Sequence, residues 1–322
     1  MKIIQPVRVL PEMLDAAAFN LTPDGQPLQV PTADPFLVAS VATNVPETDY
    51  PAWDVATAYA VGDRVMRNHR NYEALIDNTG KPPEAATSPA TWLDIGPTNR
   101  WAMFDELIGT YTENPESIEL SMALGSGVDS VAFFGVDAGL VTVRVIDPFR
   151  GIVFERSDQP VNTDGIENWH DYFTAVVRVR EDFILTGLGA GRSSVIEVKI
   201  SKPGGLARVG ALVLGKMATL GVSLYGTSVG IVDFSRKERD VFGNYVIVER
   251  GFSKRAEYDV AVETTEISRV QRLLGQYRAR PLVWVGDAQY DSTIIYGYYK
   301  DFSISISSPS ISDATITVEG LN

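Results

Sequence analysis

The sequence predicts a mainly β protein with a small aromatic β-module, a jelly-roll-like β-sandwich and a C-terminal sheet with one packed helix. Short runs rich in β-branched residues alternate with Gly, Asp, Asn and Pro along most of the 322 residues, which is the pattern of strands joined by turns. Only one stretch, in the C-terminal third, repeats its apolar residues at helical spacing. The hydrophobic fraction of 45% is that of an ordinary globular protein.

Residues 1–50 are expected to form an N-terminal proline-rich arm with a single strand. Prolines recur throughout this segment, and a proline inside a helix removes a hydrogen bond and clashes with the preceding turn. Residues 36–42 read Phe-Leu-Val-Ala-Ser-Val-Ala, which is apolar enough for one strand.

Residues 51–95 carry aromatic side chains at turn-bounded intervals, from Trp53 to Trp92. A segment of about forty residues can bury only a small core, so its rings must supply both the packing and any binding surface. The polar run from Arg67 to Asn71 predicts a hairpin turn with His69 exposed to solvent. This part of the chain is therefore expected to be a separate β-module.

The order of residues in this module resembles that of the small carbohydrate-binding modules of the chitin- and cellulose-binding type. In that family a Trp is followed by a Tyr and a Gly-Asp-x-Val turn, then by Tyr-x-Ala-Leu and a closing Trp. The matching positions in this sequence are Trp53, Tyr59, Gly62, Asp63, Val65, Tyr72 and Trp92. The resemblance implies that sugars stack on aromatic rings, and the candidate carbohydrate-binding residues are Trp53, Tyr59, Tyr72 and Trp92.

Two interpretations of these four rings remain open. Either they contact sugar together, or Tyr59, Tyr72 and Trp92 form the small core and leave Trp53 as the exposed platform. Lys81 stands in the loop where chitin-binding relatives usually place an exposed aromatic residue. The burial of the rings decides between the two interpretations.

Residues 98–225 are expected to form the β-sandwich. Regularly spaced short runs separated by turn residues favour a jelly-roll arrangement of two packed sheets. Clean alternation within residues 142–145 and 177–180 predicts strands with one packed face and one solvated face. The expected strands cover residues 128–136, 140–146, 152–156, 173–179, 195–200 and 206–214.

Residues 226–322 are expected to form a β domain around one helix, from Thr265 to Arg280. The expected strands cover residues 245–249, 258–262, 282–285, 293–306 and 314–319. Thr264 or Thr265 can cap the helix. An apolar stripe at helical spacing should pack on the sheet, and it consists of Ile267, Val270, Leu274 and Tyr277. Three arginines that project elsewhere are the candidate assembly-interface residues, namely Arg269, Arg272 and Arg280.

Several segments of this C-terminal part resemble the tail-tip and baseplate proteins of tailed bacteriophages. They cover residues 229–238, 281–286, 295–304 and 316–321. The resemblance implies a virion structural protein that is made in the host cytoplasm and built into a ring at the end of the phage tail. Its partners would be other copies of itself, neighbouring tail and baseplate proteins, and host surface polysaccharide contacted by the carbohydrate-binding-like module.

Composition excludes several other classes of function. The formal net charge of −13 and a pI near 4.7 oppose nucleic-acid binding, which relies on Lys and Arg to neutralise phosphates. With no cysteine and only two histidines, the chain lacks thiol chemistry and multi-histidine metal sites. No apolar run is long enough to cross a bilayer, and Pro6 and Arg8 interrupt any signal peptide. We therefore expect no cofactor, no metal and no membrane insertion.

The densest group of polar and aromatic residues runs from Glu167 to Tyr172. Consecutive residues point in different directions, so this run is a poor candidate for a catalytic carboxylate pair. The sequence therefore predicts a structural protein that is not an enzyme. The alternatives are a free-standing soluble glycan-binding protein and a tail-associated glycoside hydrolase.

Overall fold

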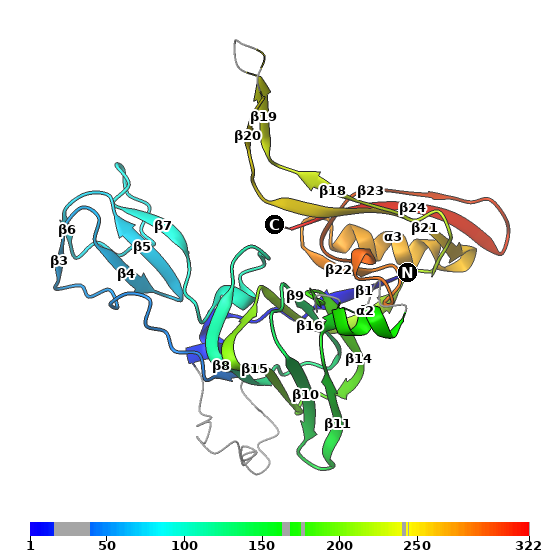
Figure 1. Cartoon of the computed structure of the whole chain (residues 1–322), viewed down its shortest axis with the longest axis horizontal. Helices are drawn as coiled ribbons and strands as arrows, with labels where there is room; N and C mark the ends of the chain where they lie inside the picture. Colours follow the sequence, from blue (N-terminus) through cyan, green and yellow to red (C-terminus); the bar gives the residue numbers. More distant parts are fainter. Residues whose placement is uncertain (16–38, 163–167, 175–177, 240–242, 244, 322) are drawn as a thin grey trace.

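The computed structural model describes residues 1–15, 39–162, 168–174, 178–239, 243 and 245–321. Strands account for 54% of the structure and helices for 9%, which confirms the mainly β class. Figure 1 shows a central sandwich, a layer of C-terminal strands with a helix, a small module to one side and a hairpin that projects away from the body.

One ten-stranded antiparallel sheet runs through the body of the protein. Its order is β14-β9-β16-β1-β22-β23-β24-β21-β17, and β18 also pairs with β21. Its strands are β1 (Lys2–Pro6), β9 (Val128–Phe134), β14 (Phe183–Ala190), β16 (Ala211–Thr219), β17 (Val222–Ser223), β18 (Ser228–Asp233), β21 (Phe252–Glu263), β22 (Leu282–Val285), β23 (Ile294–Ser305) and β24 (Ile311–Gly320). The parts expected at residues 98–225 and 226–322 thus share one continuous sheet.

Strand β1 lies in the middle of this sheet, between β16 on one side and β22 on the other. Ile4 is aligned with Met217 on β16 and with Val283 on β22. Ile3 and Ile4 are fully buried in two different core clusters, because neighbouring residues of a strand point to opposite faces. The start of the chain is therefore an integral strand of the fold rather than an extended arm.

A second, five-stranded sheet packs against the β14-β9-β16 half of the large sheet to form the sandwich. Its order is β11 (Gly151–Asp158), β10 (Leu140–Asp147), β15 (Val195–Val209), β8 (Thr112–Ala123) and β2 (Ser40–Thr43). The apolar core between the sheets includes Ile118, Val131, Val143, Ile196 and Leu212. Strand β2 contains the described end of the strand expected at residues 36–42, and residues 36–38 lie outside the described residues.

Two strands of the sandwich differ from the sequence expectations. Strand β8 is not among the expected strands, and it continues through Pro115, which lies opposite Leu206. The register shifts there because three extra residues of β15, Pro203 to Gly205, bulge out of the ladder. Residues 206–214 form the end of β15 and the start of β16. The chain turns at Gly210, whose N–H donates to the Phe134 carbonyl at 2.9 Å.

The segment expected as a strand at residues 173–179 also differs. Helix α2 (Trp169–Thr174) covers its beginning, and residues 175–177 lie outside the described residues. Its end forms β13 (Arg178–Val179), which pairs with β12 (Val161–Asn162).

The expected C-terminal helix is present as η2 (Thr264–Glu266) followed by α3 (Ile267–Gln276). Val270 and Leu274 are buried against the sheet, with Ile267 and Tyr277 half-buried beside them, so the predicted apolar stripe is confirmed. Figure 1 shows α3 lying along the strands of the C-terminal part.

The expected threonine cap is wrong. The Thr264 hydroxyl donates to the Ser308 carbonyl at 3.0 Å, and no side-chain hydrogen bond caps α3 at Glu266. The helix also ends at Gln276, where the Tyr277 N–H donates to the Leu273 and Leu274 carbonyls.

The small module consists of two sheets with an aromatic core between them. They are β3 (Ala58–Tyr59) with β6 (Asn78–Thr79), and β4 (Arg64–Arg67), β5 (Arg70–Ala74) and β7 (Trp92–Pro97). Asn68 and His69 join β4 to β5 with φ values of 49° and 59°. Two positive φ values in a two-residue loop are typical of a type I′ hairpin turn, so the predicted turn is confirmed.

The remaining elements are short. They are α1 (Pro11–Asp15), η1 (Ala102–Phe104), η3 (Asp291–Thr293), and the two-stranded hairpin of β19 (Arg236–Arg239) and β20 (Tyr245–Val248). The last pair stands clear of both large sheets (Figure 1).

Candidate functional site

Three of the four candidate sugar-binding rings are buried in the core of the module. Tyr59, Tyr72 and Trp92 are only 5–8% exposed. Tyr59 and Trp92 meet edge to face with centroids 5.2 Å apart, and Trp92 Nε1 donates to the Lys81 carbonyl at 2.9 Å. A sugar needs an open ring face for stacking, so these rings serve packing, and the burial supports the second of the two interpretations.

Trp53, the fourth candidate, is half-buried against the same cluster. The Arg67 guanidinium lies over its ring, 4.3 Å from the centroid, in a cation–π contact. Sugar stacking on Trp53 is therefore restricted to the ring face opposite Arg67. The four candidates do not form one exposed platform.

His69 is buried, so its expected exposure at the hairpin turn is wrong. Its Nδ1 lies 2.8 Å from Glu47 Oε1, and its ring stacks on Trp101 with centroids 5.7 Å apart. The Thr98 N–H donates to the His69 carbonyl at 2.9 Å. His69 is buried because it forms the contact between the module and the body of the protein, whereas Asn68 of the same turn is exposed.

Glu47 holds this junction together from the segment that precedes the module. Its Oε1 also accepts a hydrogen bond from the Thr98 hydroxyl at 2.7 Å. Burial by itself raises the pKa of the Glu47 carboxyl, but the hydrogen bonds from His69 and Thr98 outweigh burial and hold the pKa below its ordinary value. The junction therefore stabilises the ionised carboxylate.

The three candidate assembly-interface arginines are exposed, as predicted for side chains outside the apolar stripe. Arg269 and Arg272 lie one turn apart on α3, whereas Arg280 follows the end of the helix. Arg269 donates to the Thr219 carbonyl at 2.9 Å and pairs with Glu266. Arg272 donates to the Ser268 carbonyl at 3.1 Å.

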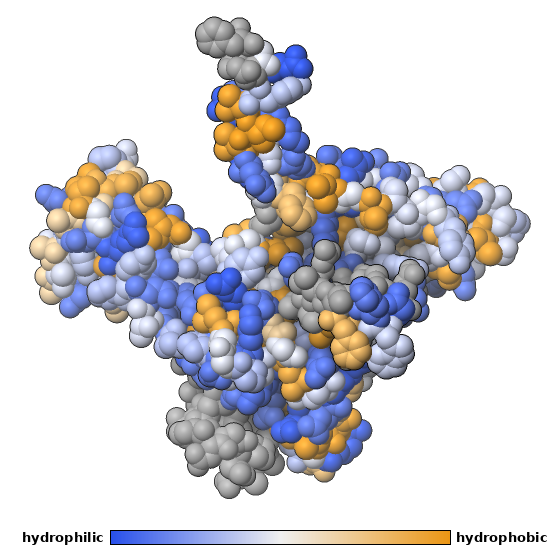
Figure 2. Space-filling model, viewed as in Figure 1, coloured by the Kyte–Doolittle hydropathy of each residue, from blue (hydrophilic) through white to orange (hydrophobic). Residues whose placement is uncertain are grey.

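A more distinctive surface is the projecting hairpin, which we define as β18, β19, β20 and Phe252 at the start of β21. Figure 2 shows apolar side chains gathered along it, far from the apolar core. Tyr245, Val246, Ile247 and Val248 are 47–65% exposed. At its base Ile231 and Phe252 are exposed as well.

The apolar residues of β20 lie on both faces of the hairpin. Side chains alternate along a strand, so Tyr245 and Ile247 point to one face and Val246 and Val248 to the other. Four consecutive apolar residues are typical of a strand that is covered on both sides. The sequence predicted this strand, but only the structure shows that nothing in the described part of the chain covers it.

Side chains that could bind a metal ion do not cluster among the described residues. No group of three His, Asp or Glu side chains gathers among them, and none of their helices is long and apolar enough to span a membrane. Trp169, from the polar and aromatic run, stacks on Phe173 at the surface with centroids 6.3 Å apart. No protein-family model matches the chain, and no curated protein matches it either.

The burial of the two tryptophans predicts different effects of substitution. Trp92→Ala should lower the free energy of unfolding of the module by about 3–5 kcal/mol, because it empties the small core. Trp53→Ala should lower it by about 1 kcal/mol, since its ring is half-exposed. Thermal unfolding followed by near-ultraviolet circular dichroism measures both changes, and a glycan array tests whether Trp53→Ala removes sugar binding. Equal loss of stability with no glycan detected would remove the carbohydrate-binding role.

The Glu47 carboxylate predicts a pH-dependent contribution to stability. A carboxyl whose pKa is lowered in the folded state stabilises the fold above its ordinary pKa of 4.5, and this contribution is lost as the pH falls through the folded-state pKa. Glu47→Gln should therefore destabilise by about 1 kcal/mol at pH 7 and by less at pH 3. Urea unfolding at both pH values measures the difference, with exposed Glu257→Gln as the control. The same loss at both pH values would contradict the role of the ionised pair.

Proposed function

We propose that this protein is a structural, self-assembling component of a phage tail tip or baseplate. In this proposal the projecting hairpin of one copy docks on a second copy within a ring-like assembly. The observation that carries the proposal is the exposure of apolar side chains on both faces of β20.

The physical reason is the free energy of covering that surface. Fully burying one Val, Ile or Leu side chain contributes about 1.5–3 kcal/mol, and β20 offers Val246, Ile247 and Val248 together with Tyr245. An isolated two-stranded hairpin is only marginally stable in water. Its outer edges also carry backbone groups that can pair with another chain. Docking on a partner therefore stabilises the hairpin and contributes to the affinity between the two chains.

A second copy is a suitable partner because the hairpin is electrically balanced. Residues 228–252 contain Arg236, Lys237, Arg239 and Arg250 against Asp233, Glu238, Asp240 and Glu249, four charges of each sign. The whole chain carries −13, so two copies repel each other at most other surfaces. A neutral apolar element is where copies can approach at the lowest electrostatic cost.

The tail-tip or baseplate setting rests on the sequence resemblance described above. In this setting the ring contacts neighbouring tail proteins, and the module stands to one side of the body where it can meet host polysaccharide (Figure 1). Glycan contact by the four candidate residues would use Trp53, since the other three rings are buried. The role proposed is scaffolding without bond cleavage.

Charges placed on both faces of β20 should abolish self-association. The variant Val246→Asp with Ile247→Asp is expected to sediment as a monomer where the wild type forms oligomers, because each exposed apolar side chain becomes a carboxylate that resists burial. Its circular-dichroism spectrum and urea unfolding curve should match those of the wild-type monomer. Sedimentation velocity over a range of concentrations measures the assembly, and electron microscopy of the purified protein shows whether the oligomers are rings.

The matched control is Val55→Asp with Val61→Asp, which changes two equally exposed valines in the module. This control should assemble like the wild type. A wild type that stays monomeric at high concentration, or a hairpin variant that assembles normally, would refute the proposed function.

The α3 arginines predict a smaller effect in the same assay. Arg269→Glu with Arg272→Glu should reduce assembly, because both side chains are exposed and can face an acidic neighbour. The loss of the Arg269 contacts with Thr219 and Glu266 should lower the free energy of unfolding by only about 1 kcal/mol, since these contacts are exposed. Assembly of this variant at wild-type strength in physiological salt would place α3 outside the contact between copies.

A further inference from the structure

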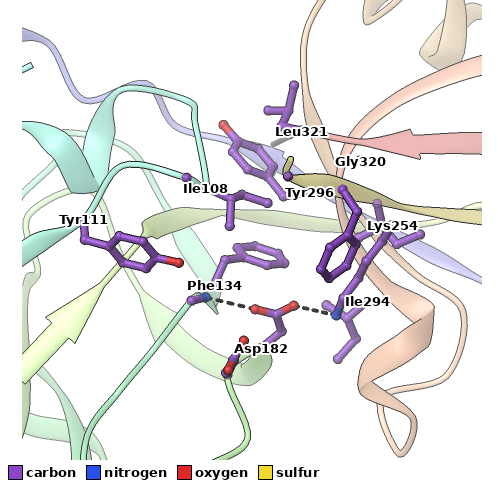
Figure 3. Close-up of a pocket in the computed structure, with 15 residues that line it drawn as sticks. Ile108, Tyr111, Phe134, Asp182, Lys254, Ile294, Tyr296, Gly320 and Leu321 are labelled. Carbon is purple, nitrogen blue, oxygen red and sulfur yellow. Dashed lines mark hydrogen bonds and ion pairs between the residues drawn. The ribbon is translucent and has the colours of Figure 1, made fainter. Parts of the chain in front are cut away.

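A cavity of about 240 Å³ opens where the sandwich meets the C-terminal half of the large sheet. Figure 3 shows its wall formed by Phe134 of β9 and Tyr296 of β23, with Ile108 and Leu321 nearby. The rings of Phe134 and Tyr296 stack with centroids 5.5 Å apart. Both rings are nearly fully buried, so the apolar surface open to a guest comes mainly from Tyr111 and Phe252, with Ile108 and Leu321 partly exposed beside them. The space fits about one aromatic side chain.

The polar rim of the cavity has an excess of negative charge. Asp182 accepts hydrogen bonds from Lys254 Nζ at 2.5 Å and from the Gly135 N–H at 2.9 Å, so Lys254 is already neutralised within the fold (Figure 3). Glu181 adds an exposed carboxylate to the rim. Burial, together with the negative charges of nearby Glu106 and Asp105, raises the pKa of the Tyr296 phenol. A guest that combines an aromatic ring with a positive charge would complement this site.

The chain carries such a pair at the tip of the β10–β11 hairpin. Phe149 is 83% exposed there and Arg150 follows it. Asp147 Oδ1 accepts hydrogen bonds from the Phe149 and Arg150 N–H groups at 3.0 Å each, and Gly151 closes the turn with φ of 72°. The tip is therefore held in one conformation, so little conformational freedom is lost when Phe149 is buried by a partner.

Figure 1 shows the β10–β11 hairpin pointing away from the C-terminal strands, so its tip and the cavity of the same copy lie apart. We propose that the Phe149–Arg150 tip of one copy inserts into this cavity of a second copy. Phe149 then packs against Tyr111 and Phe252 at the mouth of the cavity, while Arg150 approaches Glu181. The proposal rests on the proposed self-assembly and names a second contact within it. Because tip and cavity are different surfaces, the contact is head to tail and repeats around a ring or along a filament.

Cross-linking between copies tests the contact directly, since the chain contains no cysteine of its own. One preparation carries Phe149→Cys and a second, differently tagged, carries Tyr111→Cys at the mouth of the cavity. A short bismaleimide should link the two into a mixed dimer when they are combined at concentrations where the wild type assembles. Tyr225→Cys, at a fully exposed position elsewhere, replaces Phe149→Cys as the control and should give no such dimer.

Affinity measurements test the two side chains separately. Phe149→Ala should weaken self-association at least about tenfold, as expected for a buried aromatic anchor, whereas Tyr225→Ala should not. Arg150→Glu and Glu181→Arg should each weaken it, and the two combined should restore it.

The outcomes separate this contact from the proposed function. If the wild type assembles but Phe149→Ala assembles equally well and the mixed dimer does not form, the cavity contact is refuted while the hairpin-driven assembly stands. If the wild type is monomeric and no mixed dimer forms, both are refuted. A mixed dimer formed with Tyr225→Cys instead of Phe149→Cys would also overturn the proposal that the Phe149–Arg150 tip enters the cavity.

Discussion

The pairing of β1 with both of its neighbours is the constraint on which the rest of the structure depends. Its five residues connect β16 of the sandwich to β22 of the C-terminal part. The strands approach so closely that a Cβ on Gly215 would lie 2.1 Å from the Gln5 carbonyl oxygen, so only glycine fits there. Without β1, two open sheet edges would face each other, and the cavity between the two halves would lose its fixed walls.

The module is attached through a specific junction as well as through its two chain connections. His69 contacts Glu47 and stacks on Trp101, so its ring is buried against the body. This contact uses a charged hydrogen bond and an aromatic stack, which both depend on geometry. The module is thereby held in one orientation, which suits a unit that presents a surface outward from an assembly.

The distribution of apolar surface separates a scaffold from a free-standing binding protein. The rings expected to bind sugar are largely enclosed in the module core, while aliphatic side chains of β20 are exposed on both faces of the β19–β20 pair, which belongs to neither large sheet. Exposed apolar surface of this kind marks an interaction site. The balance of exposed groups therefore favours association with another protein chain over binding of small molecules.

The sequence by itself determined the mainly β class, the helix and its apolar stripe, and the β4–β5 turn, because each depends on local periodicity or turn chemistry. Only the tertiary structure decided that β1 lies at the centre of the sheet and that His69 is buried. It also decided that none of the described residues covers β20, although its sequence is that of a buried strand. The physical reason is that periodicity shows which faces of a strand are apolar. Which segment covers those faces depends on contacts between residues that are distant in the sequence.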